Sequence, residues 1–226
     1  MRHKSWPLWF RWVVANALAE MLGLGATFAV GVLIVTRLGD PRGLAAIGMM
    51  LLMTVSGVLE GLVVGLLQWA VLRQPFPQVT RHSWLVATLV GALVAWFLGS
   101  LPATLMDMGA DRPQASAQEP ETWVMLAMAA AMGLFLGLIL GVPQWRVLRH
   151  AVDKAWVWLP ANSAAWALGM PIIFGAVDRA YQAATVAGSV ATMALALALT
   201  GAVVGAVHGV ALVWLAARVK GNTGGP

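Results

Sequence analysis

The chain has 226 residues, of which 60% are hydrophobic and only 10% are charged, and its formal net charge is +5. Together with a mean hydropathy of +0.81, this composition excludes an ordinary water-soluble domain and predicts a protein embedded in a membrane. The absence of cysteine from the sequence excludes disulfide bonds, thiolate metal sites and thiol catalysis.

Six long apolar runs follow one another along the sequence. Each run exceeds the roughly 20 residues that a helix needs to cross a bilayer. The sequence therefore predicts an all-α, polytopic membrane protein, with six transmembrane helices in one domain that covers residues 1–226. The runs are Trp9–Val35, Leu44–Leu72, Trp84–Leu105, Trp123–Leu148, Trp156–Val177 and Val186–Ala217.

The six runs form three pairs with the same internal pattern. Because most connections are short, neighbouring helices are expected to pack as antiparallel hairpins. We therefore expect three hairpin repeats, at residues 9–73, 82–149 and 156–218, arranged as a pseudo-threefold bundle. The first run of each pair carries Trp12 and Asn16, Trp84 and Thr88, or Trp158 and Asn162. The second run carries Gly61, Gly65 and Gln68; Gly137, Gly141 and Gln144; or Gly201, Gly205 and His208.

The paired glycines of this pattern are suited to helix packing in lipid. Lipid tails provide little hydrophobic drive for helix association, so contacts rely on small residues that let two backbones approach. We expect each glycine pair to form such a groove, on a face that points at a neighbouring helix or at the bundle interior. The polar residue lies seven residues after the first glycine, or two helical turns, and therefore projects from the same face.

Polar side chains from all six runs are expected at a similar depth in the membrane. Helical rise places Asn16 about 6 Å inside the level of Trp12, and Gln68 about 7–8 Å inside the level of Arg73. One interpretation of this polar ring is a set of interhelical hydrogen bonds, each contributing about 0.6 kcal/mol in a membrane. The other is a vestibule that admits a polar group of a solute, a lipid headgroup or a cofactor. The ring residues are Asn16, Gln68, Thr88, Gln144, Asn162 and His208.

Three ionisable residues lie well inside the runs: Glu20, Glu60 and His208. A charged side chain at the bilayer centre costs a few kcal/mol on insertion scales, so such residues face the protein interior and often mark function. His208 occupies the position of glutamine in the other two repeats, whereas the repeat explains neither Glu20 nor Glu60. If the bundle closes into a ring, the last helix meets the first and brings His208 near Glu20.

The ionisable residues permit a proton relay, a metal site, or an axial histidine for a haem or another tetrapyrrole. A metal site is disfavoured, because the residues lack the i, i+3 or i, i+4 ligand pairs of metal sites in helix bundles. The sequence requires no cofactor, although a tetrapyrrole or another lipophilic cofactor stays an alternative. The candidate intramembrane polar site consists of His208, Glu20, Glu60, Asn16, Gln68, Gln144, Asn162 and Trp166.

Tryptophans gather at one end of the runs. The indole N–H prefers the headgroup region while the ring stays in the apolar layer, so these residues are expected to form an aromatic belt. Trp96 and Trp166 lie deeper and are candidates for core or ligand contacts. A belt this dense could equally pack against a flat pigment or a partner helix. The tryptophans expected near the cytoplasmic boundary, most of which a belt explains, are Trp6, Trp9, Trp12, Trp69, Trp84, Trp145, Trp156, Trp158 and Trp214.

Basic residues in the connections predict the orientation of the chain. Lys and Arg flank the N-terminus, the second and fourth connections and the C-terminus, whereas acidic residues dilute them on the other side. By the positive-inside rule, both termini are cytoplasmic, in a bacterial-type cytoplasmic (inner) membrane, and the loop at 107–121 lies outside. The net charge therefore indicates topology and contact with anionic lipid headgroups, and no nucleic acid partner is expected.

Two glycine-rich segments carry a family resemblance. GLVVGLLQWAVLR (Gly61–Arg73) and GLILGVPQWRVLR (Gly137–Arg149) resemble the "QW…LR" hairpins of uncharacterised bacterial membrane proteins with six helices. In the third copy, the Trp and Arg are displaced to Trp214 and Arg218. The resemblance covers most of the chain; it implies the six-helix architecture and no site residue.

Two function classes remain from the sequence. The first is a non-enzymatic accessory or scaffold subunit of a larger membrane complex, in contact with lipids, other membrane subunits, further copies of itself or a lipophilic pigment. The second is a small proton-coupled transporter or substrate-binding component, with Glu20, Glu60 and His208 near mid-membrane. A membrane enzyme is disfavoured, because no acid–base pair or activated nucleophile is evident.

Overall fold

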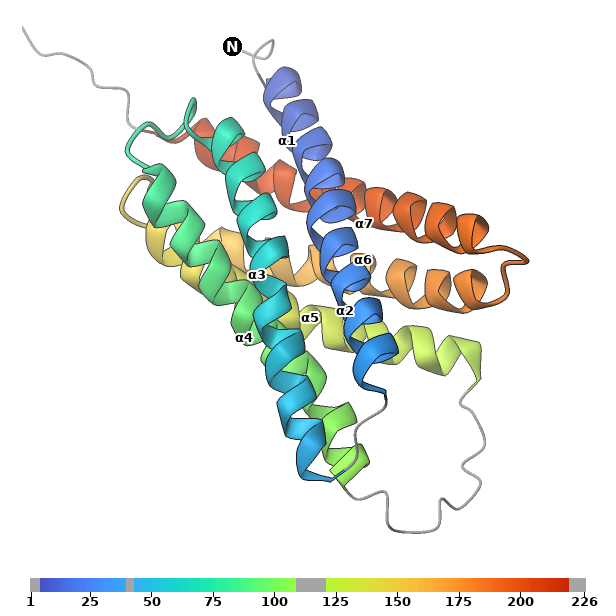
Figure 1. Cartoon of the computed structure of the whole chain (residues 1–226). Helices are drawn as coiled ribbons and strands as arrows, with labels where there is room; N and C mark the ends of the chain where they lie inside the picture. The colour runs from blue at the N-terminus through green and yellow to red at the C-terminus, as the bar shows by residue number, and fades with distance from the viewer. Residues whose placement is uncertain (1–4, 40–42, 109–120, 220–226) are drawn as a thin grey trace, which may run out of the picture.

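The computed structural model describes residues 5–39, 43–108 and 121–219 (Figure 1). All regular structure in these ranges is helical, and none of it is strand. Six helices are long and apolar enough to cross a membrane, which confirms the predicted spans. The predicted outside loop at 107–121 lies mostly outside the described residues. The elements are α1 (Ser5–Ala19), the π-helix η2 (Glu20–Leu24), α2 (Gly25–Leu38), α3 (Leu44–Leu72), α4 (Arg81–Met108), α5 (Thr122–Leu148), the short 3-10 helix η3 (Ala155–Val157), α6 (Trp158–Tyr181) and α7 (Val186–Ala216).

The helices follow one another around a closed ring. Each of α3, α4, α5 and α6 contacts the helix before it and the helix after it, and α7 contacts α1. The first span is α1, η2 and α2 in continuous order, and it packs between α3 and α7. The last span therefore closes against the first, as expected from the sequence.

The glycine grooves receive the next helix around the ring. A Cβ placed on Gly201 of α7 would overlap the carbonyl oxygen of Asn16 on α1. A Cβ on Gly137 of α5 would likewise overlap the carbonyl oxygen of Asn162 on α6. In α3, Gly61 faces the backbone of Leu89 on α4. At Gly137 and Gly201, only glycine leaves room for the backbone of the neighbouring helix, and at Gly61 a Cβ would be tightly packed.

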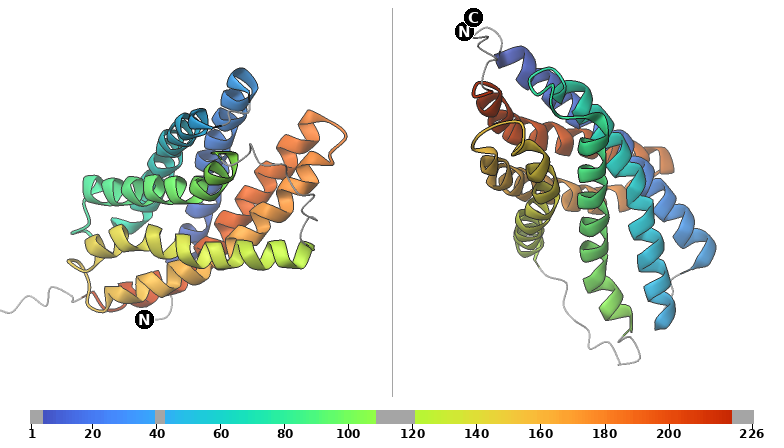
Figure 2. Two further views of the ribbon diagram at one scale, coloured as in Figure 1. Left: turned by 90° about the horizontal axis from the view of Figure 1, so that it is seen from below. Right: turned by 90° about the vertical axis from the view of Figure 1, so that its left-hand side faces the viewer.

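The two ends of the bundle differ in how closely the helices approach. Figures 1 and 2 show that the start of α1, the α3–α4 and α5–α6 connections and the end of α7 gather at one end. Towards the other end, α3 and α4 lean away from α5, α6 and α7. The cavity described below lies inside the ring, where the six spans still pack around one axis.

Three tryptophans fill the interior of the bundle at the gathered end, where the start of α1 and the end of α7 lie. Trp12, Trp84 and Trp158 have 0% exposed surface, and their rings meet edge to face, with centroids 6.0 Å apart for Trp12–Trp158 and 6.1 Å for Trp84–Trp158. Leu72 and Phe76 complete this apolar cluster. The prediction that these three tryptophans belong to an interfacial belt is wrong. They share a helical stripe with Asn16, Thr88 and Asn162, and that stripe faces the ring interior.

Candidate functional site

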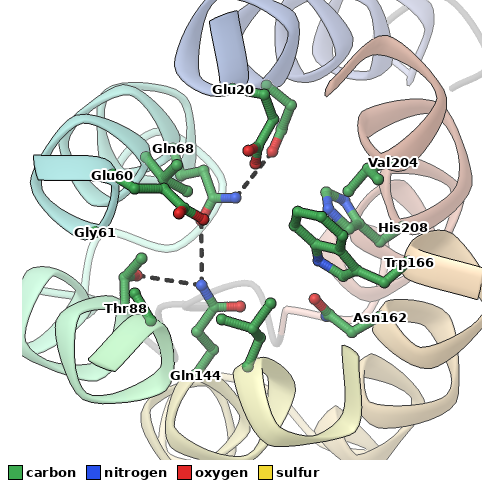
Figure 3. Close-up of a pocket in the computed structure, with 14 residues that line it drawn as sticks. Glu20, Glu60, Gly61, Gln68, Thr88, Gln144, Asn162, Trp166, Val204 and His208 are labelled. Atoms are coloured by element: carbon green, nitrogen blue, oxygen red, sulfur yellow. Dashed lines mark hydrogen bonds between the residues drawn. The ribbon is translucent and has the colours of Figure 1, made fainter. Parts of the chain in front are cut away.

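A small cavity lies on the axis of the ring, between the tryptophan cluster and a second apolar cluster around Leu24, Trp166 and Leu197. The volume open to the centre of a water molecule is about 20 Å³, which is room for about one water. The structure brings all eight candidate residues together around this cavity (Figure 3). They are Asn16, Glu20, Glu60, Gln68, Gln144, Asn162, Trp166 and His208.

Side-chain amides link the helices on one side of the cavity. Gln68 Nε2 donates to Asn16 Oδ1 at 2.8 Å, which joins α3 to α1. Gln144 Nε2 of α5 donates to Gln68 Oε1 at 3.2 Å and to Thr88 Oγ1 of α4 at 3.1 Å. Four spans are therefore tied together by one chain of buried hydrogen bonds, where unpaired polar atoms would be costly.

The repeated polar position also accepts an indole hydrogen bond in two of the three copies. Trp158 Nε1 donates to Gln144 Oε1 at 3.0 Å, and Trp12 Nε1 donates to His208 Nδ1 at 2.7 Å. Because Nδ1 of His208 is an acceptor, the imidazole is neutral and its proton is on Nε2. In the remaining copy, the indole N–H of Trp84 has no hydrogen-bond partner in the part of the chain that the structure describes.

Asparagine and threonine of the odd spans bond back to their own helices. Asn16 Nδ2 donates to the Trp12 carbonyl at 2.7 Å, and Asn162 Nδ2 donates to the Trp158 carbonyl at 3.0 Å. Thr88 Oγ1 makes the equivalent bond to the Trp84 carbonyl at 2.9 Å. The four-residue spacing of tryptophan and its polar partner therefore holds each polar side chain in a defined position.

Glu20 opens the π-helical turn η2, which lies between α1 and α2. Its side chain is 2% exposed and lines the cavity, and its Oε2 atom has no hydrogen-bond partner within residues 5–39, 43–108 and 121–219. Gly23, in the same turn, lies against the backbone of Glu60 on α3. Single π-turns occur often at functional sites, and this one places the carboxyl groups of Glu20 and Glu60 around the same small space (Figure 3).

Glu60 is held by a side chain from the neighbouring helix. Trp96 Nε1 of α4 donates to Glu60 Oε2 at 2.7 Å. The indole ring lies directly over Gly57, one turn before Glu60, where any Cβ would overlap it. The ring also meets Phe28 edge to face, with centroids 6.2 Å apart. Gly57, Trp96 and Phe28 thus fix one of the two carboxyl groups.

Several residues that build the site lie outside the predicted set. Trp12 and Trp158 share a helical stripe with Asn16 and Asn162, and this stripe is the sequence signal for their interior position. The sequence indicates only that Trp96 lies deep in its span. Its contact with Glu60 joins residues 36 apart on different helices, and no local pattern indicates such a pair.

The geometry limits what the cavity can hold. A tetrapyrrole does not fit, because the space admits about one water and the His208 ring already lies 5.5 Å from the Trp12 ring and 5.3 Å from the Trp158 ring. His208 and Glu20 line the same cavity, as expected for a closed ring. The hydrogen bond that His208 accepts comes from Trp12. Within the described ranges, no group of three or more His, Asp or Glu side chains is placed to hold a metal ion.

No family model, curated protein or solved structure matches the chain. The resemblance of Gly61–Arg73 and Gly137–Arg149 to "QW…LR" hairpins therefore rests on these two segments.

Proposed function

We propose that this multi-pass membrane protein is a non-enzymatic accessory or scaffold subunit of a larger complex in a bacterial-type cytoplasmic membrane. The observation that supports the proposal is that the interior polar groups are largely occupied by hydrogen bonds within the bundle. Most of them bond to one another or to their own helices, and the space left is about 20 Å³. Such an interior ties the six spans together and has no room for a solute of metabolite size.

The proposal includes three hairpin repeats around a pseudo-threefold axis. Corresponding contacts support it: the glycine-rich spans α3, α5 and α7 pack on α4, α6 and α1 in turn. An arginine stacks over a tryptophan four residues earlier at the end of each glycine-rich span. The stacks are Arg73 on Trp69, Arg149 on Trp145 and Arg218 on Trp214, with the guanidinium carbon 5.5, 5.5 and 3.4 Å from the ring centroid.

These arginines also support the proposed orientation and lipid contact. All three lie at the gathered end of the bundle, where cytoplasmic residues are expected to meet anionic headgroups. Beside Arg218, an apolar groove of about 420 Å³ runs between α6 and α7 and includes Val210 and Trp214. An acyl chain in this groove would place a lipid phosphate within reach of the guanidinium group.

The subunit proposal is tested by isolating the tagged protein from native membranes in polymer nanodiscs, without detergent. We expect further membrane subunits, or additional copies of this chain, in fixed stoichiometry by native mass spectrometry. Visible absorbance of the same particle would identify a pigment that the complex holds between subunits. A single chain in every particle, also after crosslinking in intact membranes, would contradict the proposal.

A second candidate function is a small proton-coupled transporter, and one observation favours it. The Oε2 atom of Glu20 is buried and unpartnered beside a second carboxyl group, which an inert frame does not require. Proteoliposomes with an imposed membrane potential and an internal pH dye test this candidate. We expect proton entry with the native protein and its loss with Glu20→Gln or Glu60→Gln. Equal proton entry in the native protein and both variants would exclude this function.

A further inference from the structure

The cavity between Glu20 and Glu60 has an unbalanced polar lining. Two carboxyl groups contribute to it, one from the π-turn η2 and one from α3, while no lysine or arginine lines it. The spans packed against η2 contribute one further titratable group, His208 of α7. Its Nδ1 accepts a hydrogen bond from Trp12, so the imidazole supplies no positive charge. The acidic pair therefore has no cationic side chain to balance it.

An unoccupied hydrogen-bonding position points into this space. Glu20 is 2% exposed, and its Oε2 atom has no partner among the described residues. Burying a polar atom without a partner is unfavourable, and burying an isolated charge is more so. The carboxyl group is directed into the cavity, where its missing partner would have to lie (Figure 3).

The two carboxyl groups are held differently, which assigns them different roles. Trp96 Nε1 donates to Glu60 Oε2 at 2.7 Å, and the indole packs against Gly57 and Phe28. Glu60 therefore has one oxygen committed to the protein. Glu20 has an uncommitted oxygen on a π-turn, and Gly23 lets this turn approach the backbone of Glu60.

Size and charge together define the occupant. The cavity has room for about one water-sized particle. Calcium needs six to eight oxygen ligands, and magnesium keeps several of its waters, so neither fits this space. A neutral solute of metabolite size does not fit either, and an anion would face two carboxyl groups. A proton or a small monovalent metal ion satisfies both limits.

We propose that Glu20 and Glu60 form an internal binding site for one exchangeable monovalent cation, a proton or Na⁺. Glu20 is the exchanging ligand, and Glu60, positioned by Trp96, is the second ligand. When Na⁺ binds, the proton of Glu20 is released, so the charge of the site does not change. This site is a separate property from the proposed subunit role. It is also compatible with a transporter, because a bound cation can stabilise a static bundle or move through a dynamic one.

Infrared difference spectroscopy on the whole protein in liposomes tests the site directly. The carbonyl stretch of a protonated carboxyl group is separate from the bands of a carboxylate, so the method reports which form Glu20 takes. We expect this band to be lost when the pH is raised. If Na⁺ competes with the proton, the band is also lost at constant pH when NaCl replaces choline chloride.

Three variants assign the band. Glu20→Gln is isosteric and is expected to lack the band change. Trp96→Phe is expected to shift the signal of Glu60 and to leave that of Glu20, because it keeps an aromatic ring at this position and removes the hydrogen bond to Glu60. Glu121→Gln is the matched control, since this exposed carboxyl group lies at the start of α5, away from the cavity.

The results separate the two cations and can overturn the site. Loss of the band with NaCl assigns Na⁺ and proton exchange, whereas loss with pH alone assigns a proton site. A band change that persists in Glu20→Gln, or a band that responds to neither pH nor NaCl, overturns the proposal. Melting curves of all three variants serve as the control for folding. Failure of this test leaves the subunit proposal standing, because that proposal depends on the composition of the isolated particle.

Discussion

Among single residues, the polar residue of the repeat (Gln68, Gln144 or His208) makes the same kind of hydrogen bond in two copies and a different kind in the third. Gln144 and His208 each accept an indole hydrogen bond from a buried tryptophan of the next helix around the ring. Gln68 instead donates to Asn16 and accepts from Gln144. The hydrogen-bond network is therefore asymmetric, although the sequence motif repeats.

His208 is expected to tolerate glutamine, because an amide oxygen can accept the Trp12 N–H as it does in the α5 copy. We expect His208→Gln to change the free energy of unfolding by less than about 0.5 kcal/mol. His208→Leu leaves the buried indole N–H unpaired and is expected to cost about 1 kcal/mol or more. Thermal unfolding in one detergent, followed by tryptophan fluorescence, measures both. Equal losses in the two variants would show that the hydrogen bond is not what His208 contributes.

Trp158 and Trp84 form a matched pair, since both are fully buried and only Trp158 has a partner for its N–H. Trp158→Phe breaks the bond to Gln144 and leaves an amide oxygen unpaired. Trp84→Phe removes an N–H that is already unpaired. We expect Trp158→Phe to be the more destabilising by about 1 kcal/mol in the same unfolding assay. A larger loss with Trp84→Phe would contradict the asymmetry of the network.

At the scale of helices, the glycine-rich face of one span and the tryptophan stripe of the next form the closest contacts. Gly137 lies against the Asn162 carbonyl, and Gly201 lies against the Asn16 carbonyl. The same asparagine side chains line the cavity. Helix contact and site geometry are therefore coupled, because moving α6 or α1 outward would also move a polar side chain of the ring.

Gly137→Ala and Gly201→Ala are expected to destabilise the bundle by about 1–3 kcal/mol, because the new methyl group would overlap the backbone of the next helix. Gly48→Ala and Gly99→Ala are matched controls, since nothing lies within 4 Å of a Cβ at either position. These two are expected to be neutral or stabilising by about 0.5 kcal/mol, because alanine favours the helix. The measurement is the melting temperature of the four variants. Similar values for the two pairs would show that the glycine grooves have room for a methyl group.

At the scale of the whole molecule, orientation decides which end of the bundle faces the cytoplasm. The gathered end carries the tryptophan cluster and the three arginine–tryptophan stacks. If this end is cytoplasmic, the apolar cluster closes the cavity towards the cytoplasm. A cation in the Glu20–Glu60 site would then exchange on the other side of that cluster.

The absence of native cysteine permits a direct test of orientation. His150→Cys lies in the α5–α6 connection and Gln182→Cys lies just after α6, and both positions are exposed. In intact cells, a membrane-impermeant maleimide is expected to label the Gln182→Cys protein and not the His150→Cys protein. After the cells are opened, both are expected to react. The reverse pattern in intact cells would invert the proposed topology.

Much of the architecture was predictable because it depends on local properties of the chain. Six spans follow from hydropathy and length, and the shared face of Gln68, Gln144 and His208 with the glycines follows from the helical period. All eight candidate residues line one cavity because buried polar groups avoid lipid. Their hydrogen-bond partners were not predictable, since each lies on a helix whose position the local sequence does not encode.

Hydropathy and the helical period are enough to give the number of possible membrane crossings and the residues that share a helical face. Three features emerge only when the helices pack together. The glycine grooves receive the next helix around the ring, Trp12, Trp84 and Trp158 lie inside, and the carboxyl groups of Glu20 and Glu60 share one small space. The reason is physical: periodicity and hydropathy act within one helix, whereas crossing angles and partner choice depend on how six helices fill the same volume.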